Sequence, residues 1–390
     1  MLDPLETILA ELRALDDAGL RRHMRAVDGP QAAEIGVDGR RAINFSSNNY
    51  LGLADSPLLI DAARRAMETG GFGAGASRLI VGNLELHRAL ELRIAAWKAT
   101  EAALLFNSGY QANVGLVSAL AGPEDSVFSD ELNHASLIDG CRLARANVIV
   151  YKHTDLADLR QKLRAEPARR RRLILTDSVF SMDGDLAPLA ELSELAREHA
   201  ALLIVDEAHA VGVLGPFGVG LCAGLAVDVQ MGTLGKALGG FGAYVAARRP
   251  IVDLLANRAR SFVFTTALPV PVVAAAQAAI DWLATPEGET RRSLLAANAA
   301  RFHRGLLELG LRTTPTPSHV VPLQVTGGDP RRAMRVSEAL LDQGVFAQGI
   351  RPPTVPTGTA RIRFALMATH TAAQIDRALD ALAAQRASLT

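Results

Sequence analysis

The chain has 390 residues, of which 49% are hydrophobic and 21% charged, and this composition is typical of a folded globular protein and excludes a disordered one. Lysine plus arginine and aspartate plus glutamate number 41 each, so no overall charge favours nucleic acid or an anionic membrane as a partner, and an anionic ligand requires a local site. Cys141 and Cys222 form no CxxC pair, which argues against a disulfide framework and a thiolate zinc site and is typical of a cytoplasmic protein.

The N-terminal segment begins with acidic residues and does not resemble a signal peptide. Apolar residues at helical spacing predict an amphipathic helix over residues 4–26, with acids near its start and arginines near its end, as the helix dipole favours. Residues 33–45 have β character, with a turn at Asp38-Gly39.

From about residue 46 short apolar runs alternate with helix-length segments, which predicts an α/β domain with a mostly parallel central sheet. The predicted strands are 102–106, 126–129, 147–151, 173–177, 201–206, 227–232 and 242–247. Helices are predicted between them, at 85–98, 156–166 and 189–199. The most apolar stretch, residues 261–284, contains two prolines and is predicted to be a loop followed by a buried helix and not a membrane span.

The C-terminal part has the pattern of a smaller α+β domain. Its predicted helices are 286–309, 331–343 and 372–385, and its predicted strands are 320–325, 346–348 and 360–366. The chain is therefore divided into an N-terminal segment 1–43, a large α/β domain 44–285 and a C-terminal domain 286–390.

Polar residues follow the predicted strand 201–206, which ends in Asp206 and is followed by His209. In open α/β sheets, ligands bind beyond the carboxyl ends of the strands. A carboxylate there pairs with a protonated ring nitrogen, and a histidine three residues later contacts the same ring. The alternative is an aspartate that caps a helix, followed by a surface histidine.

Lys236 follows another predicted strand and lies between Gly235 and Gly239, with Thr233 before it. Glycines allow close approach of backbone and ligand. A lysine in such a pocket, desolvated or near another cation, has a lowered amine pKa and becomes a nucleophile toward aldehydes. The alternative is an ordinary surface lysine after a turn, and the phosphate-loop spacing GxxxxGK[ST] is absent.

A third group, Ser108-Gly109-Tyr110, lies between the strand 102–106 and a predicted helix 112–120. Free backbone N–H groups at a helix N-terminus bind phosphate, although a plain strand–turn–helix has the same pattern. His134 comes just past a strand and could stack on a planar ring, although a core or surface histidine is the commoner case.

Together these residues resemble the α-oxoamine synthases, which are pyridoxal 5'-phosphate (PLP) enzymes of the aspartate-aminotransferase fold (fold type I). The resemblance covers nearly the whole chain, and eight motifs in one order make it specific. They are Asn44–Gly52, Gly73–Arg78 with Gly82 and His87, Ser108–Tyr110, Asn133–His134, Phe180–Gly184, Asp206–His209, Thr233–Lys236 and Arg351–Arg363.

The resemblance implies catalytic roles for Lys236, Asp206 and His134. Lys236 binds the aldehyde of PLP and later removes the Cα proton of the amino acid, Asp206 pairs with the pyridinium nitrogen, and His134 stacks on the ring. Further cofactor contacts are implied for Gly109, Tyr110, Ser181, His209, Thr233, Thr265 and Thr266. Substrate contacts are implied for Arg22, Asn48, His134, Thr354 and Arg363. Arg21 remains an alternative to Arg22, and Arg361 to Arg363.

Within the family, the string Ile350–Arg363 is most similar to members that condense L-alanine with a pimeloyl thioester in biotin biosynthesis, releasing CO2 and free thiol. The acyl carrier, CoA or a carrier protein, stays open. The family's active sites lie at a homodimer interface, where Thr265 and Thr266 are expected to reach the phosphate in the neighbouring subunit.

Two rival interpretations remain. One is a family member that uses glycine or serine, such as 2-amino-3-ketobutyrate CoA ligase or 5-aminolevulinate synthase, and the Arg351-Pro-Pro-Thr string argues against it. The other is a non-catalytic binding protein of the same fold, and the presence of Lys236 argues against it. No nucleic acid, membrane or metal partner is expected.

Overall fold

The structure is a computed structural model that describes residues 3–167, 170–311, 313 and 318–389. The chain forms two compact units. Unit 1 comprises residues 1–48, 182–184 and 294–390, and unit 2 comprises residues 49–181 and 185–293. The division at residues 43 and 285 stays a prediction about domains, and residues 1–2, 168–169, 312, 314–317 and 390, which it includes, lie outside the described residues.

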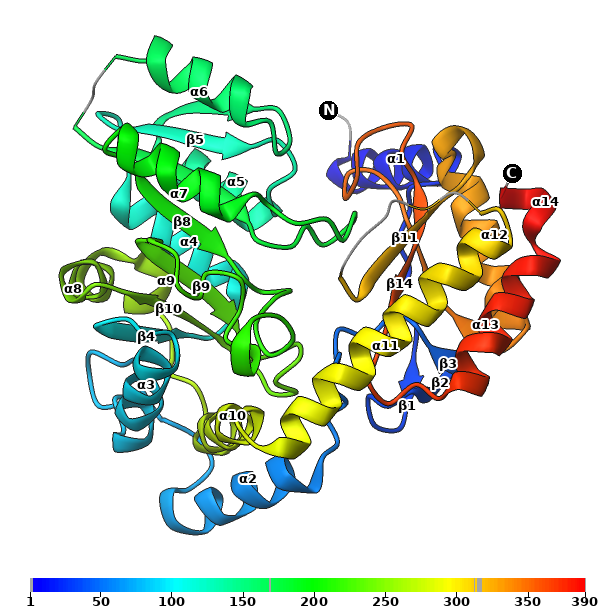
Figure 1. Ribbon diagram of the computed structural model, residues 1–390, viewed down its shortest axis with the longest axis horizontal. Coiled ribbons are helices and arrows are strands. Elements are labelled where there is room, and N and C mark those ends of the chain that lie inside the picture. The colour runs from blue at the N-terminus through cyan, green and yellow to red at the C-terminus, as the bar shows by residue number, and fades with distance from the viewer. Residues whose placement is uncertain (1–2, 168–169, 312, 314–317, 390) are drawn as a thin grey trace. The chain divides into compact units, whose positions relative to one another are not determined.

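A seven-stranded sheet forms the centre of unit 2 (Figure 1), in the order β4-β10-β9-β8-β7-β5-β6. Among the described strands, β10 runs antiparallel to both neighbours and the other pairs are parallel, so the predicted mostly parallel sheet is confirmed. The strands are β4 (Ala102–Phe106), β5 (Ser126–Asp130), β6 (Asn147–Tyr151), β7 (Arg172–Asp177), β8 (Leu202–Asp206), β9 (Val229–Thr233) and β10 (Ala243–Ala247). Each lies within two residues of a predicted strand at either end.

Helices cover both faces of this sheet. Leu173 and Leu175 of β7 belong to the core cluster that contains residues of α4, α5 and α8, whereas Ile174 belongs to the cluster that contains residues of α6 and α7. This alternation follows from the two-residue repeat of a strand. The helices of unit 2 are α2 (Pro57–Gly70), α3 (Glu85–Trp97), α4 (Gly109–Leu120), α5 (Ala135–Ala144), α6 (Leu156–Ala165), α7 (Leu189–Glu198), α8 (Arg249–Arg258), α9 (Arg260–Val263) and α10 (Val270–Leu283), with a short 3-10 helix at Pro216–Gly218.

The apolar stretch 261–284 forms a loop and the largely buried helix α10, as predicted. Among the described residues, no helix is long and apolar enough to cross a membrane. Helix α11 (Pro286–Glu308) follows α10 and contains the change from unit 2 to unit 1.

Unit 1 contains two small sheets, β1-β2-β3-β12 and β11-β14-β13. Their strands are β1 (Val27–Asp28), β2 (Glu34–Val37), β3 (Arg40–Asn44), β11 (Val320–Gln324), β12 (Val345–Phe346), β13 (Gln348–Ile350) and β14 (Arg361–Ala365). Its helices are α1 (Pro4–Asp17), α12 (Pro330–Asp342), α13 (Ala372–Ala384) and α14 (Arg386–Leu389), with a short 3-10 helix at Thr326–Gly328.

Two predictions in unit 1 were wrong. The strand expected at 346–348 is two strands, because the chain leaves one sheet after Phe346 and joins the other at Gln348. The helix expected over 4–26 ends at Asp17, because Gly19 takes a positive φ of 66° and the next two amides bond to the carbonyl of Leu15. Its last turn therefore contains no basic residue, and the expected match to the helix dipole fails at that end.

Candidate active site

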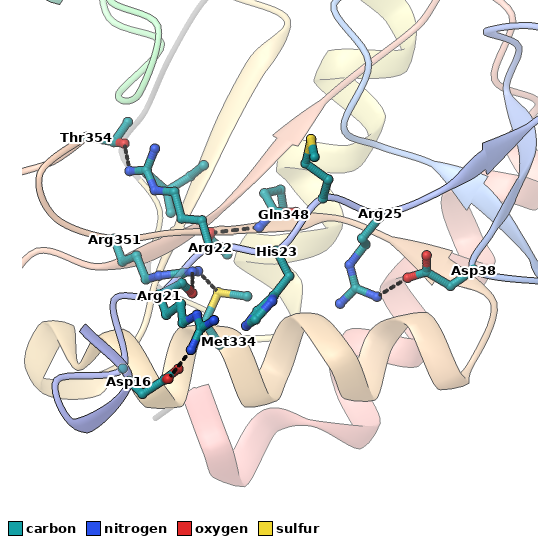
Figure 2. A pocket seen from close by; sticks show the side chains of 14 residues that line it. Asp16, Arg21, Arg22, His23, Arg25, Asp38, Met334, Gln348, Arg351 and Thr354 are labelled. Carbon is teal, nitrogen blue, oxygen red and sulfur yellow. Dashed lines mark hydrogen bonds and ion pairs between the residues drawn. The ribbon is translucent and has the colours of Figure 1, made fainter. Parts of the chain in front are cut away.

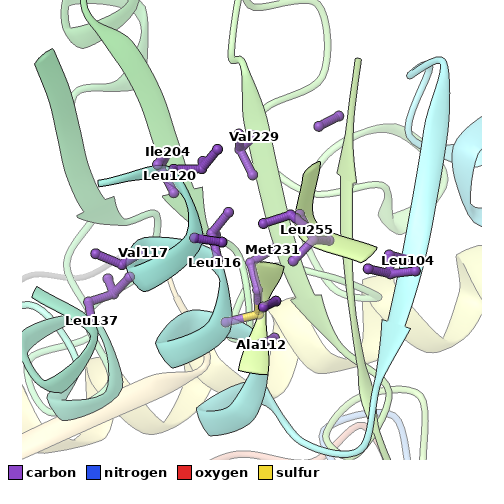
Figure 3. Close-up of a cluster of buried hydrophobic side chains, with 14 of the residues drawn as sticks. Leu104, Ala112, Leu116, Val117, Leu120, Leu137, Ile204, Val229, Met231 and Leu255 are labelled. Atoms are coloured by element: carbon purple, nitrogen blue, oxygen red, sulfur yellow. The ribbon is translucent and has the colours of Figure 1, made fainter. Parts of the chain in front are cut away.

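Two buried carboxyl groups stand side by side at the carboxyl edge of the sheet in unit 2. Asp177 and Asp206 end the neighbouring parallel strands β7 and β8 and are paired in register. Because side chains alternate along a strand, both lie on the face of Ile204, against which α4 packs (Figure 3). Their exposed fractions are 5% and 3%.

Asp206 is held by donors at both carboxylate oxygens. Asn113 of α4 donates through Nδ2 to Oδ2 at 2.7 Å, and the backbone N–H of Ala208 donates to Oδ1 at 2.8 Å. The same amide of Asn113 donates to the hydroxyl of Ser136, which is fully buried. The carboxylate therefore has a fixed orientation. No motif in the sequence pointed to Asn113 or Ser136, because a single polar residue gives no signal for a partner far along the chain.

His134 caps helix α5 beside these carboxyl groups. Its backbone N–H donates to Asp177 at 2.8 Å, and its Nδ1 lies 2.7 Å from the hydroxyl of Ser136. Burial and the Asp206 carboxylate raise the pKa of Asp177 well above its usual range. Desolvation lowers the pKa of His134, the Asp206 carboxylate opposes this, and Lys236 adds to the lowering. The surroundings thus disfavour the charged form of the Asp177 carboxyl and of the His134 ring.

Lys236 is singled out among the four lysines of the chain. Lys98 is buried in an ion pair, Lys162 pairs with a carboxylate on its own helix, and Lys152 is exposed. The amine of Lys236 lies 2.7 Å from Nε2 of His209. Its charge also lowers the pKa values of His134 and Asp177. Lys236 is thus the lysine that the fold places among the predicted site residues of unit 2.

His209 and a glycine turn fix the place of this amine. Nδ1 of His209 lies 2.7 Å from the hydroxyl of Tyr50, and both side chains are buried. Gly239 has a φ of +68°, and a Cβ there would lie 2.5 Å from the backbone carbonyl carbon of Leu53, so the turn after Lys236 requires glycine at this position. The sequence pattern around Tyr50 did not indicate this contact with His209, which is 159 positions away.

The predicted phosphate-binding turn lies at a helix N-terminus, but the helix begins earlier than expected. Helix α4 starts at Gly109 and not at Ala112, because the hydroxyl of Ser108 accepts a hydrogen bond from the amide of Gln111 and caps the first turn. Gly109 and Tyr110 therefore take the first two helical positions. The N–H groups at these positions have no partner inside a helix and are available to donate to a phosphate.

Three threonines expected near the phosphate lie close to the same edge of the sheet. Asn107, which precedes this turn, donates to the hydroxyl of Thr265 at 3.1 Å and to the carbonyl of Thr266 at 2.8 Å. Thr233 ends β9, and its hydroxyl donates to the carbonyl of Gly242 at 3.1 Å. The contact of Thr265 and Thr266 with a neighbouring subunit stays a prediction.

Ser181 stands at the tip of a hairpin that follows β7. The backbone N–H of Phe180 donates to the carbonyl of Asp185 at 3.0 Å, which closes the last pair before the tip. At the base, the N–H and hydroxyl of Ser178 both donate to the carbonyl of Asp206, at 2.8 and 3.1 Å. The hairpin that carries Ser181 is thereby tied to the strand end that carries Asp206.

The two arginines of β14 in unit 1 have different partners. Arg361 forms an ion pair with Asp183, and Arg363 donates to the side-chain oxygen of Asn48 at 3.1 Å. Both arginines are buried, at 6% and 8% exposure. The structure thus brings Arg363 together with Asn48, two residues expected to contact substrate, while the charge of Arg361 is matched within unit 1.

A pocket of about 610 Å³ in unit 1 contains two more of the expected substrate contacts (Figure 2). Arg22 donates to the hydroxyl of Thr354 at 2.8 Å, whereas Arg21 pairs with Asp16 at 2.6 Å. Neither arginine is on a helix, contrary to expectation, because α1 ends at Asp17. The structure brings Arg22 and Thr354 together, whereas Arg21 lines the same pocket with its guanidinium paired to Asp16.

Arg351 adds a second cation to this pocket, and sequence analysis did not name it as a site residue. It is 7% exposed and donates to the carbonyl of Arg21 at 2.6 Å (Figure 2). Burial and the nearby charge of Arg22 lower the pKa of Arg351. Two guanidinium groups that repel each other in a pocket are stabilised by an anion between them.

Comparison with known proteins identifies the family of the chain. Residues 40–382 match the family model described as aminotransferase class I and II. The chain belongs to this family. It is 54% identical to the 8-amino-7-oxononanoate synthase of Geotalea daltonii and 52% identical to that of Geobacter sulfurreducens, in both cases over 97% of each chain.

Solved structures of the family have the same fold. A serine palmitoyltransferase from S. paucimobilis with bound PLP–myriocin is 33% identical, with a TM-score of 0.92 over 99% of each chain. The 8-amino-7-oxononanoate synthase of Francisella tularensis is 29% identical, with a TM-score of 0.76 over 89% of this chain and 98% of the other. The predicted family and fold are confirmed.

Proposed function

We propose that this chain catalyses the 8-amino-7-oxononanoate synthase reaction of biotin biosynthesis, in which L-alanine and a pimeloyl thioester give 8-amino-7-oxononanoate, CO2 and free thiol. The observation that carries the proposal is the identity of 52–54% over 97% of the chain to relatives of that name. The expected reaction class and cofactor agree with these relatives and with PLP-bound structures of the family.

The residues of unit 2 fit PLP by their chemistry. A primary amine, Lys236, suits the aldehyde, the braced carboxylate of Asp206 suits a protonated ring nitrogen, and the start of α4 suits a phosphate. The residues that would hold the cofactor are Gly109, Tyr110, His134, Ser181, Asp206, His209, Thr233, Lys236, Thr265 and Thr266. When bound, PLP supplies an electron-withdrawing ring that stabilises negative charge on the Cα of the amino acid.

Lys236 has two tasks in this proposal. Its Nζ would hold the aldehyde of PLP, and as a free amine it would act as the general base that removes the Cα proton of the amino acid. His209 lies 2.7 Å from this nitrogen, and the hydroxyl of Tyr50 is hydrogen-bonded to the other ring nitrogen of His209. These contacts keep the amine beside the other proposed cofactor contacts. His134, braced by Ser136, is proposed to stack on the ring and to contact substrate.

The substrate carboxylates are proposed to bind in unit 1. Arg363 with Asn48 suits the carboxylate of L-alanine through two parallel N–H donors. Arg22 with Thr354, next to Arg351, suits the distal carboxylate of the pimeloyl chain. Arg22 and Arg351 would favour binding of pimeloyl over palmitoyl thioesters. A palmitoyl chain ends in a methyl group, which forms no ion pair with a guanidinium group.

Replacing Arg363 with alanine is expected to raise the KM for L-alanine by about 10- to 100-fold, since a hydrogen bond to a charged group contributes about 1.5–3 kcal/mol. Lysine in its place keeps the charge but lacks the planar fork, so partial recovery is expected. The measurement is steady-state kinetics at saturating acyl thioester. Arg361→Ala is the matched control, and a rise in KM in that variant with none in Arg363→Ala would reverse the assignment.

The substrate assignment is tested with the purified holoenzyme. L-alanine, glycine and L-serine are each mixed with pimeloyl-CoA, with pimeloyl carrier protein and with palmitoyl-CoA, and the release of CO2 and free thiol is followed. We expect turnover with L-alanine and a pimeloyl thioester. Turnover with glycine but not with alanine would contradict the proposal, and turnover of serine with palmitoyl-CoA would favour the second candidate, which the likeness to serine palmitoyltransferase suggests.

The proposal also includes a homodimer with the active site at its interface, in which Thr265 and Thr266 reach the phosphate of the neighbouring subunit. We place the enzyme in the cytoplasm, and its two free, buried cysteines support this.

A further inference from the structure

His153 lies between two carboxylates in unit 2, outside the set of residues proposed to touch cofactor or substrate. It follows β6, and its Nδ1 is 2.9 Å from Asp130 and its Nε2 2.6 Å from Asp185. The ring also meets Phe180 edge-on, with ring centroids 4.3 Å apart. One imidazole thus joins three segments: the end of β5, the end of β6 and the hairpin after β7.

This imidazole is a cation at neutral pH. Burial alone would lower the pKa of His153, but the hydrogen bonds and charges of Asp130 and Asp185 outweigh it and raise the pKa to about 10. The side chains of His153 and Asp130 are 20% and 1% exposed, so water screens this pairing only in part.

The Asp130 side of this contact leads to His134. Asp130 ends β5, and its carboxylate accepts the N–H groups of Leu132 and of Thr154, both at 2.9 Å. Asn133 then donates to the carbonyl of Leu175 on the next strand, at 2.9 Å. The turn between β5 and α5 is therefore fixed by Asp130 at its start and by Asn133 before its end. His153 supplies the positive charge that faces the Asp130 carboxylate.

The Asp185 side leads to Ser181. Asp185 and Phe180 form the last backbone pair of the hairpin before its tip, and His153 touches the side chains of both. In the described part of the chain, Nε2 of His153 is the only hydrogen-bond donor to the Asp185 carboxylate. Without this contact the Asp185 carboxylate, whose side chain is 32% exposed, would have no hydrogen-bond donor among the described residues.

We propose that His153 is a positioning residue for the cofactor. As a cation clamped by Asp130 and Asp185, it fixes two separate loops relative to each other. One loop presents the ring of His134, and the other presents the hydroxyl of Ser181. This inference rests on the proposed function, because it takes the cofactor to be PLP held by those two side chains.

The test measures PLP affinity apart from activity. Apoprotein is titrated with PLP, the visible absorbance of the lysine-bound cofactor reports binding, and the thermal midpoint of the apoprotein reports stability. His153→Gln is expected to raise the dissociation constant of PLP about tenfold, which corresponds to about 1.4 kcal/mol. Asp185→Asn keeps the side-chain shape and is expected to have a smaller effect of the same sign, so the test stands if His153→Gln does not fold.

Asp125→Asn is the matched control. Asp125 precedes the same strand β5 at its other end, is buried and pairs with Arg170. Its replacement is expected to lower the thermal midpoint but to leave the dissociation constant of PLP within about twofold. The inference is overturned if His153→Gln and Asp185→Asn behave like this control. Wild-type protein that bound no PLP at all would instead overturn the proposed function.

Discussion

Replacing Lys236 with alanine is expected to reduce kcat by at least about 10³-fold, because a general base alone contributes about 10²- to 10⁴-fold and this variant loses the nucleophile as well. The amine lies 2.7 Å from His209, and in the described part of the chain no other lysine is hydrogen-bonded to a proposed cofactor contact. The measurement is the release of free thiol from pimeloyl-CoA with L-alanine, together with the absorbance of covalently bound PLP after gel filtration.

Two further variants separate the chemistry of this amine from its charge. Lys236→Arg keeps a cation that stays protonated near neutral pH, so we expect it to be as inactive as the alanine variant. Lys152→Ala removes an exposed lysine and is expected to leave activity and cofactor binding unchanged. If Lys236→Ala kept more than about a tenth of the wild-type kcat, the lysine would not be the general base.

Much of unit 2 could be predicted from the sequence because most of its strands are buried on both faces. Such strands are short runs of Val, Ile and Leu that stand out from the helical segments between them. The ends of these runs also located Asp206, Lys236 and His134, since polar residues that directly follow a buried strand lie at one edge of a parallel sheet. Local patterns therefore identified both the sheet and the edge that carries the candidate site.

Contacts between distant segments could not be predicted in this way. Asn113 and Asp206 are 93 positions apart, and His153 and Asp185 are 32 apart. A single asparagine or histidine gives no periodic signal, and its partner is set by which strands become neighbours. The helix boundaries that were predicted wrongly are set by single capping residues, such as Ser108 before α4. The spacing of apolar residues carries no information about such a cap.

The ion pair between Lys98 and Glu207 joins residues 109 positions apart, and no local pattern in the sequence predicts it. Their side chains are 1% and 0% exposed, and Lys98 also donates to the carbonyl of Val219. Glu207 follows Asp206 directly, and its carbonyl accepts the amides that form the turn carrying His209. The pair therefore anchors the segment between two of the proposed cofactor contacts.

Replacing Lys98 with methionine is expected to lower the free energy of unfolding by about 3–5 kcal/mol, because it leaves the Glu207 carboxylate buried without a counterion. For a unit of this size the thermal midpoint is expected to fall on the order of 10 °C. The double variant Lys98→Met with Glu207→Gln removes both charges and keeps an oxygen that accepts the amide of Cys222, 2.9 Å away in the wild type, so we expect it to recover most of the loss.

Calorimetry of the apoprotein distinguishes these outcomes. Arg301→Met, which breaks an ion pair whose side chains are 43% and 49% exposed, is the control and is expected to change stability by less than about 1 kcal/mol. Equal losses in the single and double variants would mean that the packing of the lysine side chain, and not its charge, stabilises this region. A single variant as stable as wild type would mean that water reaches Glu207, in which case the pair could not hold the turn that carries His209.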